Sequence, residues 1–164
     1  NDRELGSWNQ RVYTLQKRDY IRTYEHTIVE EYKSVKMSEV LSKKQSILNI
    51  DFLHSKIGEF WSSPEDFLAT GVGYCAIYKN EIVSVCFSGF VVDNVHCIDI
   101  ETLKEHQGKK LAQKVARSFV EDCLAKDIVP YWDCMESNKS SIAVAEKIGF
   151  RNIVNYKGFE FKFE

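Results

Sequence analysis

The sequence has 164 residues, of which 44% are hydrophobic, 28% are charged and two are prolines, which excludes collagen-like, low-complexity and wholly disordered chains. Its 22 basic and 24 acidic residues nearly cancel, so the overall charge attracts neither nucleic acid nor an anionic membrane. We therefore expect an ordinary folded protein with no nucleic-acid and no membrane partner.

The N-terminal part, residues 1–70, gives mixed signals. Residues 8–15 alternate between apolar and polar as a strand would, whereas apolar residues at helical spacing predict helices over 20–32 and 47–61. The stretch 32–40 fits a short edge strand. We expect this part to be mainly helical.

From residue 71 onward the pattern predicts three consecutive antiparallel strands. Segments 72–78 and 82–92 are rich in β-branched and aromatic residues and flank a tight turn at 79–81, so they predict a hairpin. A third strand is expected over 95–103, after a second turn.

The rest of the chain predicts two helices with a strand between them. The helix over 107–126 carries two neighbouring apolar rows, and a strand is expected over 128–134. Asn138 is the expected N-cap of the next helix, which Gly149 ends in a left-handed conformation. The chain is expected to close with a hairpin of strands at 153–156 and 159–163.

The start of the helix after the third strand is the candidate functional site. A helix N-terminus exposes unpaired N–H groups, and Gly108 would let a ligand approach this one closely. Five basic residues and one acid lie between Lys104 and Arg117, so this segment favours a phosphate. The chain contains neither GxxxxGK[ST] nor GxGxxG, which disfavours a P-loop or a dinucleotide-binding turn.

Two motifs here resemble the GCN5-related N-acetyltransferases, the GNAT superfamily. The segment Gln107-Gly-Lys-Lys-Leu-Ala112 is similar to the family's Q/R-x-x-G-x-G/A, although Lys110 replaces the central glycine. An asparagine about eleven residues before a Gly-Phe pair is matched by Asn138 and Gly149-Phe150. The resemblance covers residues 70–164, and several short runs look like the bacterial branch that includes zwittermicin resistance proteins.

The resemblance implies an α/β fold with a mixed, mostly antiparallel central sheet and helices on both faces. It implies one domain over 1–164, with acceptor-site elements in 1–70, an acetyl-CoA-binding core at 71–164, and an N-terminal region missing before Asn1. The implied activity is the transfer of an acetyl group from acetyl-CoA to an amine of a small molecule. The implied cofactor-binding residues are Thr102, Leu103, Gln107, Gly108, Lys109, Lys110, Leu111, Ala112 and Asn138.

The replacement of the family's central glycine by Lys110 has three interpretations. The side chain pairs with a phosphate, crowds the turn that the usual glycine would keep open, or is simply a solvated charge on the surface.

The acceptor amine needs a base, and the third predicted strand supplies the candidates. His96 shares a face with Thr102 and is a candidate base; the alternative is a packed or surface histidine. Asp99 and Glu101 lie on the opposite face and, with Asp93, would attract a cationic amine; the alternative is a solvated face.

A general acid for the departing thiolate is less evident. The tyrosine that many relatives carry seven residues after the asparagine is Ala145 here. Water or one of three other side chains would take the role: Tyr131, Cys134 and Tyr156.

Two other functions stay open: a noncatalytic acyl-CoA-binding or regulatory module, and a protein interaction domain. The second would use aromatic residues as a partner or homodimer surface, the alternative being that they are core: Trp8, Tyr13, Phe60, Trp61 and Phe67. Five cysteines without a CxxC indicate small core residues in a cytoplasmic protein. No metal is expected, because no metal-ligand spacing relates His26, His54 and His106.

Overall fold

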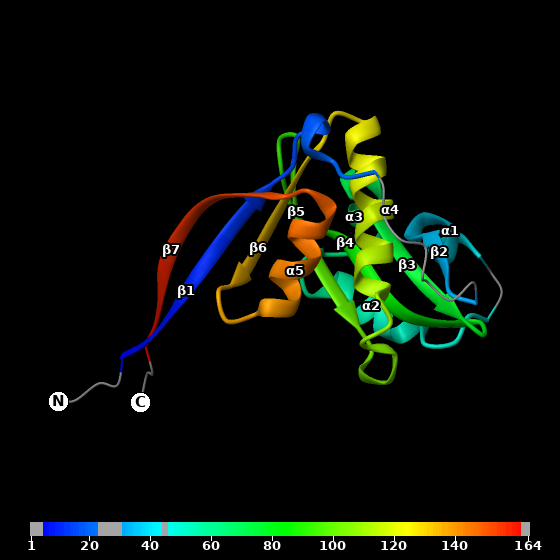
Figure 1. Cartoon of the computed structure of the whole chain (residues 1–164). Coiled ribbons are helices and arrows are strands. Elements are labelled where there is room, and N and C mark those ends of the chain that lie inside the picture. The colour runs from blue at the N-terminus through cyan, green and yellow to red at the C-terminus, as the bar shows by residue number, and fades with distance from the viewer. Residues whose placement is uncertain (1–4, 23–30, 44–45, 162–164) are drawn as a thin grey trace. The chain divides into compact units, whose positions relative to one another are not determined.

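A computed structural model describes residues 5–22, 31–43 and 46–161 (Figure 1). The described residues form two compact units. The first joins those of 1–22 with those of 131–164, and the second consists of those of 23–130. Within the described residues, no helix has both the length and the apolar character that a membrane crossing requires.

The second unit contains a four-stranded sheet in the order β2-β3-β4-β5, with each neighbouring pair antiparallel. The predicted hairpin and third strand are confirmed as β3, β4 and β5. The elements of this unit are β2 (Lys33–Lys36), α1 (Met37–Ser42), α2 (Ile50–Gly58), α3 (Pro64–Thr70), β3 (Gly73–Tyr78), β4 (Glu81–Val92), β5 (Val95–Thr102), the 3-10 turn η2 (Lys104–His106) and α4 (Leu111–Ala125).

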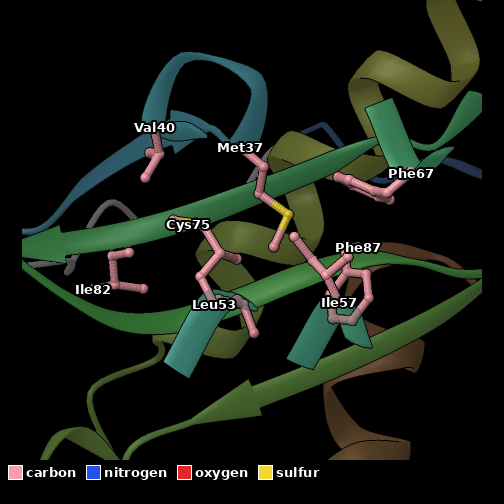
Figure 2. Close-up of a cluster of buried hydrophobic side chains, with 9 residues drawn as sticks. Met37, Val40, Leu53, Ile57, Phe67, Cys75, Ile82 and Phe87 are labelled. Atoms are coloured by element: carbon pink, nitrogen blue, oxygen red, sulfur yellow. The ribbon is translucent and has the colours of Figure 1, made fainter. Parts of the chain in front are cut away.

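Helices cover both faces of this sheet. Cys75 of β3 belongs to a buried cluster with side chains of α1, α2 and α3 (Figure 2). Its neighbour Tyr74 donates a hydrogen bond to Asp122 of α4 at 3.0 Å. Because successive side chains of a strand point to opposite faces, α4 lies on the face opposite the cluster. The cluster contains Met37, Val40, Leu53, Ile57, Phe67, Cys75, Ile82, Val85 and Phe87.

Helix α4 begins later than predicted. The expected start at Gln107 is wrong, because Gly108 and Lys110 both have a positive φ, of 78° and 60°, and a right-handed helix cannot pass through them. The first helical residue is Leu111. Beyond that point the apolar rows are confirmed, with buried residues at Leu111, Val115, Ala116, Phe119, Val120, Cys123 and Leu124.

The first unit contains three strands in the order β6-β1-β7, again paired antiparallel. Its elements are β1 (Leu5–Thr14), the 3-10 turn η1 (Lys17–Asp19), β6 (Val129–Met135, in this unit from Tyr131 onward), α5 (Lys139–Ile148) and β7 (Arg151–Phe161). Both ends of α5 are as predicted: the Asn138 side chain accepts a hydrogen bond from the Ser141 N–H at 3.2 Å, and Gly149 has a φ of 112°.

The predicted closing hairpin is wrong, because residues 151–161 form one continuous strand, β7, that pairs with β1. Gly158 is not a turn residue. It lies opposite Trp8, and a Cβ at position 158 would be 2.4 Å from Cε2 of the indole. The glycine therefore makes room for a ring that lies across the strand. Residues 162 and 163 are outside the described residues.

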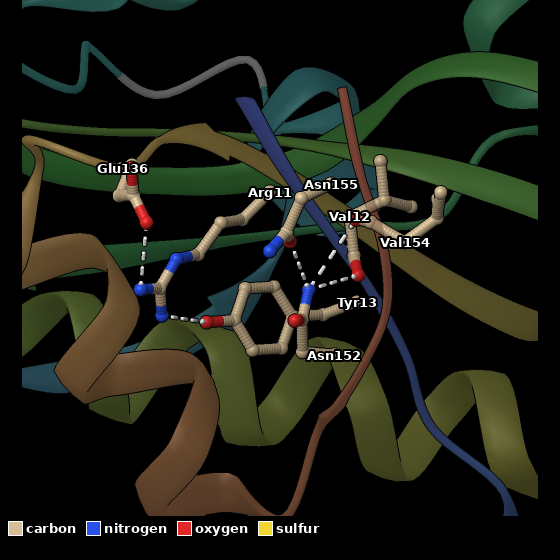
Figure 3. Close-up of polar contacts among 7 residues, drawn as sticks. All are labelled: Arg11, Val12, Tyr13, Glu136, Asn152, Val154 and Asn155. Atoms are coloured by element: carbon tan, nitrogen blue, oxygen red, sulfur yellow. Dashed lines mark hydrogen bonds and ion pairs between the residues drawn. The ribbon is translucent and has the colours of Figure 1, made fainter. Parts of the chain in front are cut away.

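Asn152 supports β7 where its register against β1 shifts, between Val12 and Tyr13. Its amide group donates to the Val12 carbonyl at 3.0 Å and to Asn155 Oδ1 at 2.9 Å (Figure 3). Side-chain hydrogen bonds thus serve this strand at the point where the regular ladder is interrupted.

The N-terminal expectations have mixed outcomes. The alternation over 8–15 is confirmed as part of β1 as far as Thr14, and the helix over 47–61 is correct only for α2, Ile50–Gly58, because Asn49 has a left-handed backbone. The edge strand over 32–40 is correct only for Lys33–Lys36, because helix α1 begins at Met37. Most of the helix expected over 20–32 lies outside the described residues, and its flanks, Tyr20–Arg22 and Glu31–Tyr32, are not helical.

The aromatic residues considered as a partner surface are mainly internal. In the second unit Phe67 is buried and Trp61 packs against the same cluster, while Phe60 is 40% exposed. In the first unit Tyr13 is buried and Trp8 is half-buried. The interpretation as core residues is the better one for four of the five.

Candidate active site

The chain leaves β5 through a turn, residues 103–110, that delivers it to the start of α4. Leu103 N–H donates to the Val83 carbonyl at 2.9 Å, and η2 follows. Gly108 then adopts its left-handed conformation, and nothing lies within 4 Å of the place a Cβ would occupy. The backbone of the turn is therefore open on the Gly108 side.

Lys110 is the last residue before α4 and has the second positive φ of the turn. This conformation costs a residue with a Cβ roughly 1–2 kcal/mol, whereas glycine adopts it freely. Lys110 therefore adopts a backbone conformation that a glycine would adopt at no cost.

The first turn of α4 is suited to an anion. The first N–H groups of a helix have no partner inside it and carry about half a positive charge. The first N–H of α4 to bond an upstream carbonyl is that of Lys114, to Lys110 at 3.1 Å, and the first turn holds no acid. A phosphate group at this end would meet unpaired N–H donors and a net positive charge.

The edge of β5 beside the turn presents main-chain groups. The Leu103 N–H points toward β4, and directions alternate along a strand, so the Thr102 N–H and carbonyl point away from β4. The side chain of Gln107 donates to that carbonyl at 3.1 Å. The Thr102 hydroxyl bonds the hydroxyl of Ser84 at 2.7 Å. Gln107 therefore ties the turn to the end of β5.

Two lysines of the basic segment are directed to Tyr32. Lys109 Nζ donates to the Tyr32 hydroxyl at 3.1 Å, and Lys114 Nζ donates to the Tyr32 carbonyl. Burial lowers the pKa of Lys114. The role of Tyr32 is not evident from the sequence, because nothing in its neighbourhood along the chain indicates a contact with residues 77 and 82 positions away.

His96 is only 3% exposed, and its Nδ1 lies 2.7 Å from the hydroxyl of Ser88. That hydroxyl also accepts the Val72 N–H at 3.0 Å. Burial, followed by the charge of Lys126, lowers the pKa of His96, so the imidazole is neutral near pH 7. The residue is both packed and chemically able to accept a proton.

Asp99 and Glu101 are held by Lys56 of α2, which the sequence analysis did not single out. Lys56 Nζ lies 3.2 Å from Asp99 Oδ2, 3.1 Å from Glu101 Oε2 and 3.0 Å from Glu59 Oε2. Burial raises the pKa of Asp99, and Lys56 acts in the opposite direction. These carboxylates are therefore paired, on the face of β5 opposite His96, and the structure does not bring the three candidates together.

Asn138 lies in the first unit, where it is exposed and caps α5 through its side-chain oxygen. Ser140 Oγ donates to the same oxygen at 3.1 Å. Its expected contact with the cofactor stays a prediction.

The general-acid candidates also lie in the first unit. Burial raises the pKa of Cys134, which makes a thiolate less accessible, and Ala145 is fully buried. Tyr156 is half exposed, donates to Asp133 at 3.4 Å and lines a pocket of about 360 Å³. The other residues of that pocket are Asn9, Glu136, Asn155 and Lys157. Tyr131 is half-buried.

Among the described residues, no group of three or more His, Cys, Asp or Glu side chains is placed to hold a metal ion. His54 is exposed on α2 and His106 ends η2, whereas His26 lies outside the described residues.

The sequence matches the family described as GNAT acetyltransferase over residues 3–159. The chain belongs to the GNAT acetyltransferase family. The superfamily resemblance of the sequence motifs is thereby confirmed, together with the mixed α/β fold and its mostly antiparallel strands. The match to the zwittermicin-resistance branch stays a prediction.

Two similar proteins match large parts of this chain. It is 42% identical over 98 residues to a Bacillus subtilis (strain 168) protein named uncharacterized N-acetyltransferase YdfB, covering 60% of this chain and 38% of that protein. A GCN5-related N-acetyltransferase-like protein from Streptococcus suis 89/1591 matches with a TM-score of 0.72 and 18% identity, over 98% of this chain and 64% of that one.

A GNAT family acetyltransferase from Elizabethkingia anophelis, solved with acetyl-CoA bound, matches with a TM-score of 0.54 and 16% identity, over 75% of this chain and 78% of that one. The chain thus spans less than two thirds of the length of the first two relatives, whereas it spans more than that of the third.

Proposed function

We propose that this GNAT protein is an acetyl-CoA-dependent N-acetyltransferase that acetylates an amine of a small molecule. The observation that carries the proposal is the turn from β5 into α4. Its left-handed residues, Gly108 and Lys110, lead into the N-terminus of α4, and the Gln107 side chain ties the turn to Thr102, whose N–H points away from β4. The acetyl-CoA held by the Elizabethkingia anophelis relative supports this choice of cosubstrate.

In this proposal the pyrophosphate of acetyl-CoA binds the main-chain N–H groups of residues 107–112, and the ammonium groups of Lys109 and Lys110 add favourable charge. The pantetheine arm runs beside the end of β5 at Thr102 and Leu103 in the manner of an added strand, with the outward-pointing Thr102 N–H as its main-chain donor. The Thr102 N–H, which points away from β4, donates to the thioester carbonyl. Asn138 holds the cofactor from the first turn of α5.

A protonated acceptor must lose two protons, one to free the lone pair of its nitrogen and one as the amide forms, and the thiolate takes one proton back. His96, directly or through water, accepts the first proton; the amine nitrogen then forms a bond to the thioester carbon, and its second proton leaves to water. Negative charge develops on the carbonyl oxygen and strengthens its hydrogen bond to the Thr102 N–H. The carbon–sulfur bond then breaks, and the thiolate takes a proton from water or from Tyr131, Cys134 or Tyr156.

Asp99 and Glu101 have a recruiting role in this proposal. With Glu59 they place three carboxylates around the single ammonium group of Lys56, so an excess of negative charge stays available. That excess favours a cationic acceptor over a neutral one.

We also propose that the protein works in the cytoplasm without a metal and forms a homodimer. Its five free cysteines, four of them buried, fit a reducing compartment.

The test is an assay of thiol release from acetyl-CoA with a panel of small amines, read together with thermal unfolding. We expect acetyl-CoA to raise the melting temperature, and at least one amine to give equimolar free CoA and acetylated product. Stabilisation without thiol release would indicate the noncatalytic acyl-CoA-binding module. No stabilisation would favour the protein interaction domain.

A further inference from the structure

Tyr32, Tyr78 and His106 form an aromatic cluster to which the proposed mechanism assigns no role. Tyr32 is 3% exposed, and its ring is stacked on that of Tyr78, with centroids 4.6 Å apart. The imidazole of His106 packs edge-on against both rings, at 5.8 Å and 5.5 Å. The ring of Tyr32 therefore has a defined place beneath the turn that leads into α4.

The Tyr32 hydroxyl joins two separate points of that turn. It lies 3.0 Å from His106 Nδ1, at the end of η2, and 3.1 Å from Lys109 Nζ, between the two left-handed residues. These two residues flank Gln107 and Gly108. The Tyr32 carbonyl receives the ammonium group of Lys114, so the first turns of α4 are anchored to the same residue.

The turn needs such an anchor because it makes few regular hydrogen bonds of its own. The bond from Gln107 N–H to Lys104 is long, at 3.3 Å, and the space beside Gly108 is open. A segment that contains a glycine and is not paired with a strand can adopt many conformations, and it loses this freedom when it binds a ligand. Holding it in one conformation beforehand lowers the entropy cost of binding.

We propose that Tyr32 is a positioning residue for the cofactor-binding turn: its hydroxyl holds the backbone of residues 106–109 in the conformation that receives the diphosphate. The proposal rests on the proposed function. Tyr32 is assigned no contact with the reacting atoms, so its effect falls on the affinity for acetyl-CoA and not on the chemical step.

The test is the variant Tyr32→Phe, which removes the hydroxyl and keeps the stacked ring. We expect the Kd and KM for acetyl-CoA to rise about tenfold and kcat to stay within twofold of the wild type, since two charge- or imidazole-linked hydrogen bonds are lost. Hydrogen exchange at the amides of 106–112 should become faster in the variant without cofactor.

Tyr78→Phe is the matched control, because the Tyr78 hydroxyl has no hydrogen bond in the described part of the chain. It makes the same chemical change in the same ring stack, and we expect its Kd and exchange rates to match the wild type. Equal Kd values and equal exchange rates for the two variants would overturn the proposal.

A second variant covers the case in which Tyr32→Phe is poorly folded. His106→Phe keeps an aromatic ring but removes Nδ1, and it should raise the Kd in the same direction. We expect the Kd of the double variant for acetyl-CoA to be at most about twofold higher than that of Tyr32→Phe, because both changes break one network. Fully additive effects would contradict the proposal.

Failure of the proposed function is distinguishable from failure of this inference. Wild-type protein that neither binds nor consumes acetyl-CoA would refute the function. In that case faster exchange confined to Tyr32→Phe would still support a positioning role for the turn, and unchanged exchange would refute it.

Discussion

His96 and Ser88 illustrate how a buried polar pair limits what a single residue can do. The Ser88 hydroxyl has one proton, and both His96 Nδ1 and the Val72 carbonyl, 3.2 Å away, compete for it. If the proton goes to Val72, then His96 Nδ1 must carry a hydrogen and donate it to Ser88. The other ring nitrogen, Nε2, is then the acceptor that a base requires.

Because of His96, we expect both the activity and the stability of the protein to fall at acidic pH. Its pKa is below the ordinary 6.5 because burial, and then Lys126, disfavour the charged form. The unfolded chain therefore binds more protons than the folded one below pH 6.5, so the unfolding free energy should fall as the pH drops through that region. The activity at saturating substrate should also fall below pH 6.5, because a protonated base cannot accept the proton of the amine.

The variant His96→Gln tests both effects. We expect a loss in kcat that higher pH partly relieves, and a flatter dependence of urea-unfolding free energy on pH below 6.5. Ser88→Ala is a useful companion because it keeps the imidazole and removes its partner. A pH–rate profile in His96→Gln that equals the wild type would remove the base role.

At the scale of elements, the pairing of β1 with β7 depends on a small residue in the middle of a strand. Gly158 lies opposite Trp8, whose Nε1 donates to Gln10 at 3.0 Å and so fixes the indole over β7. Glycine is usually unfavourable in a strand interior. Here it prevents a collision with the ring.

We predict that Gly158→Ala lowers the unfolding free energy by about 1–3 kcal/mol, because the new Cβ would lie 2.4 Å from the indole and the pair must repack. Denaturant unfolding measures the loss. Trp8→Ala in the same chain should relieve the collision, so the double variant should be more stable than the sum of the two single changes implies. Simple additivity would contradict the contact.

At the scale of the whole molecule, charge is nearly balanced, while the turn proposed to bind the cofactor is locally basic. With a formal net charge of -2, long-range attraction contributes little to binding a polyanion. The favourable field must come from α4 and the lysines near its start, which act over about one Debye length, roughly 8 Å at physiological salt.

Reversing two of these charges should therefore weaken the binding of acetyl-CoA far more than reversing two charges at other exposed lysines. We expect Lys109→Glu with Lys110→Glu to raise the Kd at least tenfold in titration calorimetry, because acids at a helix N-terminus oppose a phosphate. Lys33→Glu with Lys43→Glu gives the same net charge at exposed positions, and its Kd should stay within about twofold. Similar losses in both variants would place the phosphates elsewhere.

Local patterns in the sequence determined β3, β4, β5, the body of α4, and the capped helix α5, because period, turn residues and caps act over a few neighbouring residues. They also determined the family motif at Gln107–Ala112. The sequence did not predict the positive φ of Gly108 and Lys110, because of which α4 begins only at Leu111. The helical spacing of apolar residues continues through these positions whatever the backbone conformation.

Only the tertiary structure decided that β7 is one strand, that Lys56 pairs with Asp99, and that Tyr32 holds Lys109. Each of these contacts joins residues more than 40 positions apart. A local sequence window holds no information about such a partner. Packing of side chains brought together by the fold sets these contacts, which is why the sequence did not reveal Lys56 or Tyr32.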